Sequence, residues 1–170
     1  MRTARIVLIS LIFIAFAAVA SFADTDTATH DVTININEVA AVGLNNGAAI
    51  TLNVIRPVTA GDDPIGESDA TKTIQYTSLN AGVATRKIQA KINAAAPAGT
   101  ALTLTASNPV GASAGTAQPT ATLSTTDADI IIGIGSHATG ATGPTLTYQL
   151  NVTNMADLVV GGGGSVTVTL

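Results

Sequence analysis

The sequence has 170 residues, of which 46% are hydrophobic, and its formal net charge is −4. Its seven basic residues are too few and too scattered for nucleic-acid binding, which requires clustered Lys and Arg against the phosphates. Cys is absent, which excludes a disulfide framework and a lipoprotein anchor.

The first 23 residues predict a secretory signal peptide. Arg2 and Arg5 supply positive charge, and residues 6–18 form an uncharged apolar run. Residues 21–23 (Ser-Phe-Ala) follow as a cleavage site, and residues 18–20 are a second candidate. The apolar run is shorter than the ~20 residues that span a bilayer, which favours cleavage over a retained anchor. We therefore expect a secreted protein, extracellular or at the cell surface, with no membrane span after cleavage.

The chain after the signal peptide is poor in aromatic side chains. It retains Tyr76 and Tyr148 but no Phe and no Trp. Glycan and nucleic-acid sites usually stack rings against their ligands, so this scarcity counts against both kinds of site. We expect three parts: the signal peptide 1–23, a flexible polar lead 24–30 and a single β-sandwich domain 31–170.

Alternation of apolar and polar residues predicts strands along most of the domain. The alternating runs are residues 32–37, 50–54, 73–77, 87–93, 101–105, 145–153 and 165–170. Segments rich in Gly, Asn and Pro separate them, and only residues 155–160 suggest a short helical turn. This pattern predicts an all-β fold: a single antiparallel β-sandwich, immunoglobulin-like, with about eight or nine strands.

Two segments depart from the alternation. Residues 129–135 contain a continuous apolar run, which predicts a strand that is buried on both faces or carries a bulge at Gly133. Residues 107–118 are rich in Gly, Ala and Ser and are predicted to form a surface loop.

A series of short segments carries a family resemblance. The segments are residues 74–78 (IQYTS), 86–92 (RKIQAKI), 97–102 (PAGTAL), 130–136 (IIIGIGS), 139–140 (TG), 146–150 (LTYQL) and 166–170 (VTVTL). From about Asp31 to Leu170 the chain resembles a group of small, secreted, largely uncharacterised β-proteins of Bacteroidota. Members of that group often close on a Thr-Tyr-Thr-Leu strand, whereas Val168 stands here in place of the Tyr. The resemblance implies export and a β fold, and it brings no activity.

Carboxylates gather in one predicted loop. Asp62, Asp63, Glu67 and Asp69 supply the hard oxygen ligands that calcium prefers, although their spacing does not match an EF-hand. A solvated acidic loop is the favoured interpretation, and calcium is the alternative.

No catalytic residues are predicted, and we expect that the protein is not an enzyme. Ser136 and His137 are adjacent but lack the strand–turn–helix context of a nucleophile elbow, so a turn is the favoured interpretation.

The terminal runs are candidates for strand exchange between copies of the protein. Val32, Ile34 and Ile36 lie in the first run, and Val166, Val168 and Leu170 lie in the last. Either set of side chains could fill pockets along a neighbour's sheet edge, and a self-completed monomer is the alternative.

Three of the basic residues lie together on one predicted strand: Arg86, Lys87 and Lys91. They either protect an edge strand from uncontrolled pairing or meet an acidic partner. The expected function is an extracellular structural subunit of a fibre, layer or matrix, whose partners are copies of itself. The alternative is a monomeric secreted binding module for a glycan or a metal ion.

Overall fold

The computed structural model describes residues 29–170. The predicted signal peptide 1–23 and most of the predicted lead lie outside these residues. Ile36–Leu170 forms one compact unit, and the described residues 29–35 belong to a separate one.

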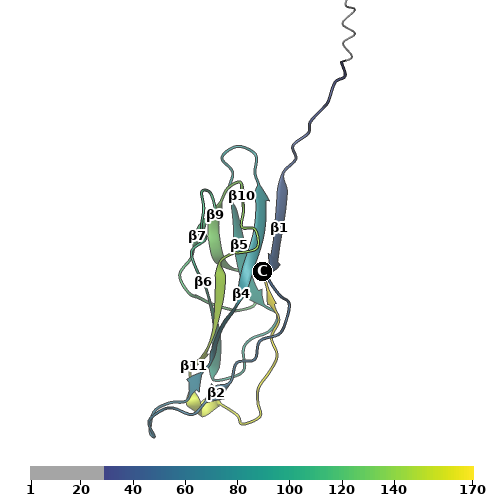
Figure 1. Cartoon of the computed structure of the whole chain (residues 1–170). Coiled ribbons are helices and arrows are strands. Elements are labelled where there is room, and N and C mark those ends of the chain that lie inside the picture. The colour runs from purple at the N-terminus through teal and green to yellow at the C-terminus, as the bar shows by residue number, and fades with distance from the viewer. Residues whose placement is uncertain (1–28) are drawn as a thin grey trace, which may run out of the picture. The chain divides into compact units, whose positions relative to one another are not determined.

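The described residues contain twelve strands and one 3-10 helix. Figure 1 labels those elements for which there is room. The strands are β1 (Val39–Leu44), β2 (Val54–Ile55), β3 (Ile65–Gly66), β4 (Ser68–Leu79), β5 (Arg86–Ile92), β6 (Thr100–Ala106), β7 (Thr116–Ala117), β8 (Ala121–Thr122), β9 (Ala128–Ile134), β10 (His137–Ala138), β11 (Thr145–Val152) and β12 (Val168–Thr169); the helix is η1 (Met155–Asp157).

Two antiparallel sheets make up the body of the unit. The larger has the order β1-β4-β11-β6-β8, with β10 also paired to β4, and the smaller has the order β12-β5-β9-β7. A separate hairpin joins β2 to β3. The long strand β4 organises the larger sheet, because one half pairs with β11 while the other half pairs with β1 and β10.

The hydrophobic core lies between the two sheets. The inward-facing residues that are essentially inaccessible to solvent come from both sheets: Ile74, Ile92, Leu104, Ile130, Ile131, Ile134 and Leu146. Alternate residues of β5 and β6 are buried, as two sheets packed face to face require. The predicted all-β antiparallel sandwich is therefore confirmed. Its immunoglobulin-like character stays a prediction.

The predicted strands match the structure best in the middle of the chain. β4, β5, β6 and β11 overlap four of the alternating runs, and η1 lies within the predicted helical turn. The structure has more strands than the eight or nine expected, because six of the twelve are only two residues long. Such short bridges leave no periodic signal in a sequence.

The predicted strand at residues 32–37 is wrong, and of the predicted strand 50–54 only Val54 lies in a strand, β2. Residues 31–38 and 50–53 are assigned no strand, whereas β1 forms at residues 39–44, which do not alternate. β1 forms because β4 offers it a continuous antiparallel partner over six residue pairs. Pairing with β4 therefore determines where this strand forms, and the alternation of apolar and polar residues does not.

The continuous apolar run behaves as predicted. Within β9, the neighbours Ile130 and Ile131 are both buried, and the pairing of β9 with β5 shifts register at this point. Gly133 has a φ of 71°, which glycine adopts without strain. Within the predicted surface loop 107–118, by contrast, residues 116–117 form β7 and Ala114 is buried.

No helix within residues 29–170 is long and apolar enough to cross a lipid bilayer.

Candidate functional site

The first alternating run exposes its apolar side chains. Val32 is 71% exposed, Ile34 is 80% exposed and Ile36 is 81% exposed. The residues between them are exposed as well, and none of residues 31–38 is assigned a strand. Large aliphatic side chains are usually buried, so three of them alternating on one unpaired segment form an unusual surface.

The last run behaves differently. Val166, Val168 and Leu170 are partly buried and pack against the core. Within this run, Val168 and Thr169 pair with Ile92 and Lys91 of β5. Of the two predicted exchange candidates, the last run is therefore engaged within its own unit.

Glu38 ties down the start of β1. Its carboxylate accepts a hydrogen bond from the backbone N–H of Ala81 at 3.0 Å and one from the Arg86 guanidinium at 3.2 Å. Both partners lie at the turn that joins β4 to β5, which fixes where the chain enters the sheet.

The inward face of β1 is not covered by the opposite sheet. The register places Ala40, Val42 and Leu44 opposite the inward-facing Ser78, Tyr76 and Ile74 of β4. Directly opposed residues share a face, so these three β1 residues point to the core side. They are nevertheless exposed, with Val42 at 49% and Leu44 at 38%. The sandwich is thus open along β1.

β5 has a partly unpaired edge on the same side. One edge of β5 pairs with β9 along most of its length, whereas β12 pairs with the other edge only at Ile92 and Lys91. Within residues 29–170 no segment pairs with residues 86–90 on that second edge. Backbone groups of alternate residues point to opposite edges, so those of Lys87 and Gln89 face the open edge as those of Lys91 face β12.

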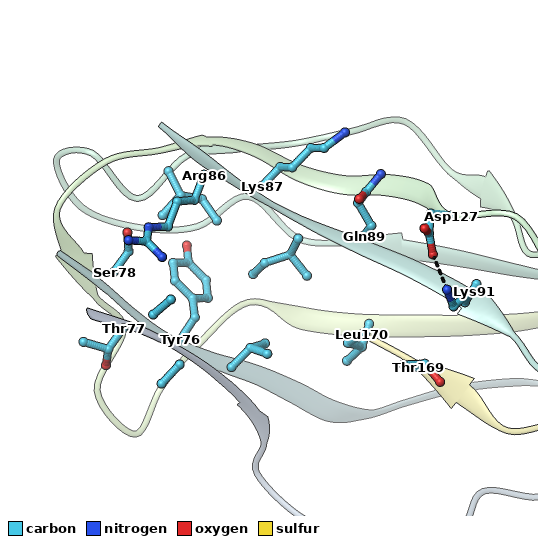
Figure 2. A pocket seen from close by; sticks show the side chains of 15 residues that line it. Tyr76, Thr77, Ser78, Arg86, Lys87, Gln89, Lys91, Asp127, Thr169 and Leu170 are labelled. Atoms are coloured by element: carbon cyan, nitrogen blue, oxygen red, sulfur yellow. Dashed lines mark ion pairs between the residues drawn. The ribbon is translucent and has the colours of Figure 1, made fainter. Parts of the chain in front are cut away.

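A groove of about 420 Å³ runs between β1 and β5, as Figure 2 shows. Thr169 and Leu170 at the end of β12 lie at one end, and Arg86 and Ser78 lie at the other. Its floor and walls combine apolar and polar side chains. The lining residues are Ala40, Ala41, Val42, Tyr76, Thr77, Ser78, Arg86, Lys87, Ile88, Gln89, Lys91, Asp127, Ile134, Thr169 and Leu170.

The rim of the groove on β5 is basic and paired within the chain. Lys87 contacts Asp129 at 3.0 Å. Lys91 contacts Asp127 at 3.0 Å, as Figure 2 shows. The hydrogen bond from Lys87, together with one from Gln89, lowers the pKa of Asp129 below its ordinary value. Ion pairs between exposed side chains are weak because water and salt screen them, so the lysines of the rim can exchange partners.

Tyr76 forms part of the groove floor. Its hydroxyl donates a hydrogen bond to the carbonyl of Ala114, and its ring lies near that of His137. Burial raises the pKa of Tyr76 above the ordinary value of 10.0. Burial also raises the pKa of Tyr148, with a smaller effect from the charge of Asp69.

We therefore expect the folded protein to lose stability as the pH rises above about 10, because the unfolded chain ionises its two tyrosines first. Tyrosinate absorbance of the folded protein should rise at a higher pH than that of the urea-unfolded chain, and denaturation midpoints should fall over the same range. Coincident titration of folded and unfolded samples would show that the tyrosines are not buried as described.

The predicted acidic loop does not assemble into one cluster. Glu67 accepts hydrogen bonds from the backbone N–H and side-chain amide of Asn53. Asp69 accepts from the backbone N–H and hydroxyl of Thr71, which lowers the pKa of Asp69. Within residues 29–170 no three His, Asp or Glu side chains are grouped to hold a metal, Asp62 and Asp63 included. Calcium binding stays a prediction.

Ser136 and His137 serve separate local contacts. The Ser136 hydroxyl accepts a hydrogen bond from the N–H of Asn80 at 3.0 Å, in keeping with the predicted turn. The His137 Nε2 atom is buried without a hydrogen-bond partner among the described residues. A carbon of the same ring lies 2.8 Å from the position that a Cβ on Gly111 would occupy.

Sequence reasoning identified one half of the candidate site and missed the other. Val32, Ile34 and Ile36 were found from their alternation, whereas the groove was not. The cluster of basic residues on β5 was the only local signal of an open edge, and β1 gave no signal. A scan of protein-family models, a search of curated proteins and a search of solved structures each found no match to the chain.

Proposed function

We propose that the protein is an extracellular structural subunit that assembles into a fibre, layer or matrix through β-strand exchange. The donated strand is the segment 31–37. The observation that carries the proposal is the exposure of Val32, Ile34 and Ile36 on an alternating segment that has no assigned strand partner.

The energetics favour self-association over permanent exposure. Burying one Val or Ile side chain stabilises a complex by ~1.5–3 kcal/mol, and this segment offers three. Main-chain hydrogen bonds to a sheet edge add to that affinity, while alternate side chains supply specificity. Ordering the segment and fixing the subunits oppose these gains.

The form of the assembly follows from the asymmetry of the contact. The surface that gives the strand differs from the surface that receives it, so exchange in one direction makes a head-to-tail contact. Such contacts produce rings when the rotation between subunits closes and open filaments when it does not. Strand exchange would also add stability to a secreted protein that has no Cys, because no disulfides reinforce its single domain.

Polymer formation by residues 24–170 tests the proposal. We expect filaments or sheets in negative-stain electron microscopy and high-mass species in size-exclusion chromatography. Changing Ile34 and Ile36 to Asp should weaken assembly at least ~100-fold, because two anchoring side chains would become charged groups in an apolar site. A matched control changes Thr33 and Asn35 to Asp, which adds the same charge on the other face of the strand and should leave assembly largely intact.

Two results would contradict the proposal. The first is a wild-type protein that stays a monodisperse monomer at high concentration, and the second is equal loss of assembly in both double variants. If the monomer instead melted at a higher temperature with calcium, and Asp62→Ala with Asp63→Ala removed that effect, the binding-module alternative would replace the structural one.

A further inference from the structure

We infer that the groove between β1 and β5 receives residues 31–37 of a second copy, which run antiparallel to β5 with Val32, Ile34 and Ile36 directed inward. This inference rests on the proposed strand exchange and adds to it the acceptor site, the orientation and the face of the incoming strand.

The acceptor is an edge with unfilled hydrogen-bonding capacity. β12 occupies β5 only at Ile92 and Lys91, and the backbone groups of Lys87 and Gln89 face the open part of the same edge. An incoming strand can therefore continue the smaller sheet along the same line as β12. All strand pairs in the two sheets are antiparallel, and antiparallel ladders have the better hydrogen-bond geometry, which sets the direction of the incoming strand.

The groove also needs apolar side chains on one face of its occupant. On β1, the inward-facing Ala40 and Val42 line the groove and are exposed although they lie on the core side. Across the groove, Ile88 and Leu170 mark the other wall. A strand inserted beside β5 places every second side chain over these residues. The spacing of Val32, Ile34 and Ile36 meets that requirement, and Thr33 and Asn35 then face solvent.

To occupy this position in its own subunit, the segment would have to fold back on β1 as a hairpin. Only Glu38 separates residues 31–37 from β1, whereas the tightest antiparallel hairpin needs a loop of two residues. Glu38 is itself held by Ala81 and Arg86, which fixes the chain at that point. A hairpin inside one subunit would have to shorten β1 or the donated strand. A second copy needs no such shortening, because its segment enters the groove from outside the subunit.

Charge and length agree with this assignment. Residues 24–38 contain no Lys or Arg, and Asp31 lies at the start of the donated strand. The antiparallel orientation brings Asp31 toward Lys91, at the β12 end of the basic rim. The open edge spans residues 86–90, and the seven residues 31–37 are long enough to cover it.

Cross-linking between two singly substituted proteins tests the acceptor site, and the absence of native Cys makes the result unambiguous. One protein carries Thr33→Cys and the other carries Gln89→Cys or Lys87→Cys, all on outward faces. Under mild oxidation we expect disulfide-linked dimers at least about tenfold above a control pair in which Thr122→Cys on β8 is the acceptor, because a seated strand holds the sulfurs at millimolar effective concentration.

A second measurement does not depend on the substitutions. Backbone amides of Lys87 and Gln89 should exchange hydrogen slowly in wild-type polymers and rapidly in the monomeric Ile34→Asp, Ile36→Asp variant. Polymers that form with no protection of these amides and no cross-link above the Thr122→Cys control would overturn the assigned groove while leaving strand exchange standing. A wild-type chain that does not polymerise would overturn strand exchange itself.

Discussion

Replacing Gly143 by alanine is expected to destabilise the protein by about 3 kcal/mol or more, because the added Cβ has no space. An ideal Cβ at this position lies 1.7 Å from the carbonyl oxygen of Ile74. The atoms nearest to this Cβ belong to the main chain of Ile74 and Gln75, so no flexible side chain can move aside. The next residue, Pro144, accepts a hydrogen bond from the N–H of Ile74 at 2.9 Å, and the substitution must break this approach.

Gly43→Ala is the matched control for that substitution. Gly43 lies in β1, has nothing within 4 Å of the position of its Cβ, and does not have a positive φ. Its replacement should change the free energy of unfolding by less than about 0.5 kcal/mol. Urea denaturation followed by circular dichroism measures both variants. Equal stability of the two would mean that residues 143–144 do not pack against β4 as described.

Replacing Leu104 by alanine is expected to cost about 2–5 kcal/mol of the free energy of unfolding. Leu104 has no exposed surface and sits in the middle of β6, where it faces the opposite sheet. Its pairing with Tyr148 of β11 and Ala121 of β8 holds the backbone in place, so the core cannot collapse readily around the cavity. The loss is large for a domain whose total stability is only about 5–15 kcal/mol.

Val83→Ala provides the comparison, because Val83 is 100% exposed in the turn between β4 and β5. Its effect should lie within about 0.5 kcal/mol. Urea denaturation of both variants measures these changes in the free energy of unfolding, provided that the slope of each transition stays unchanged. A small effect of Leu104→Ala alongside that of Val83→Ala would show that the aliphatic core is looser than the burial of Leu104 implies.

Sequence reasoning succeeded where a strand has one buried and one wet face. The runs around Ile74, Ile88, Leu104 and Leu146 alternate clearly, and each proved to be a strand with its apolar residues in the core. The same reasoning predicted that residues 129–135 form a strand that is buried on both faces or bulged at Gly133, since a continuous apolar run fits a half-buried strand poorly. The pairing of β9 with β5 shifts register in this segment.

The same rule failed at the N-terminal end for a physical reason. Residues 31–37 alternate as clearly as β5 does, yet a strand requires a neighbour to complete its hydrogen bonds, and alternation does not supply one. β1 is the converse case: its sequence, VAAVGL, lacks alternation, but β4 provides a partner through six residue pairs. The local sequence pattern therefore indicates which residues are compatible with a β-strand. It does not indicate which of them have a partner strand to pair with.

The candidate site likewise has one part that the local sequence pattern predicts and one part that depends on tertiary contacts. Sequence by itself determined the alternation of Val32, Ile34 and Ile36 with polar residues, because side-chain order is a local property of the chain. Only the tertiary structure decided where an open edge lies, since that edge depends on β12 pairing with β5 at Ile92 and Lys91 and on β1 standing uncovered across the groove. Those contacts join residues far apart in the chain, and their free energy is set by packing that no local window contains.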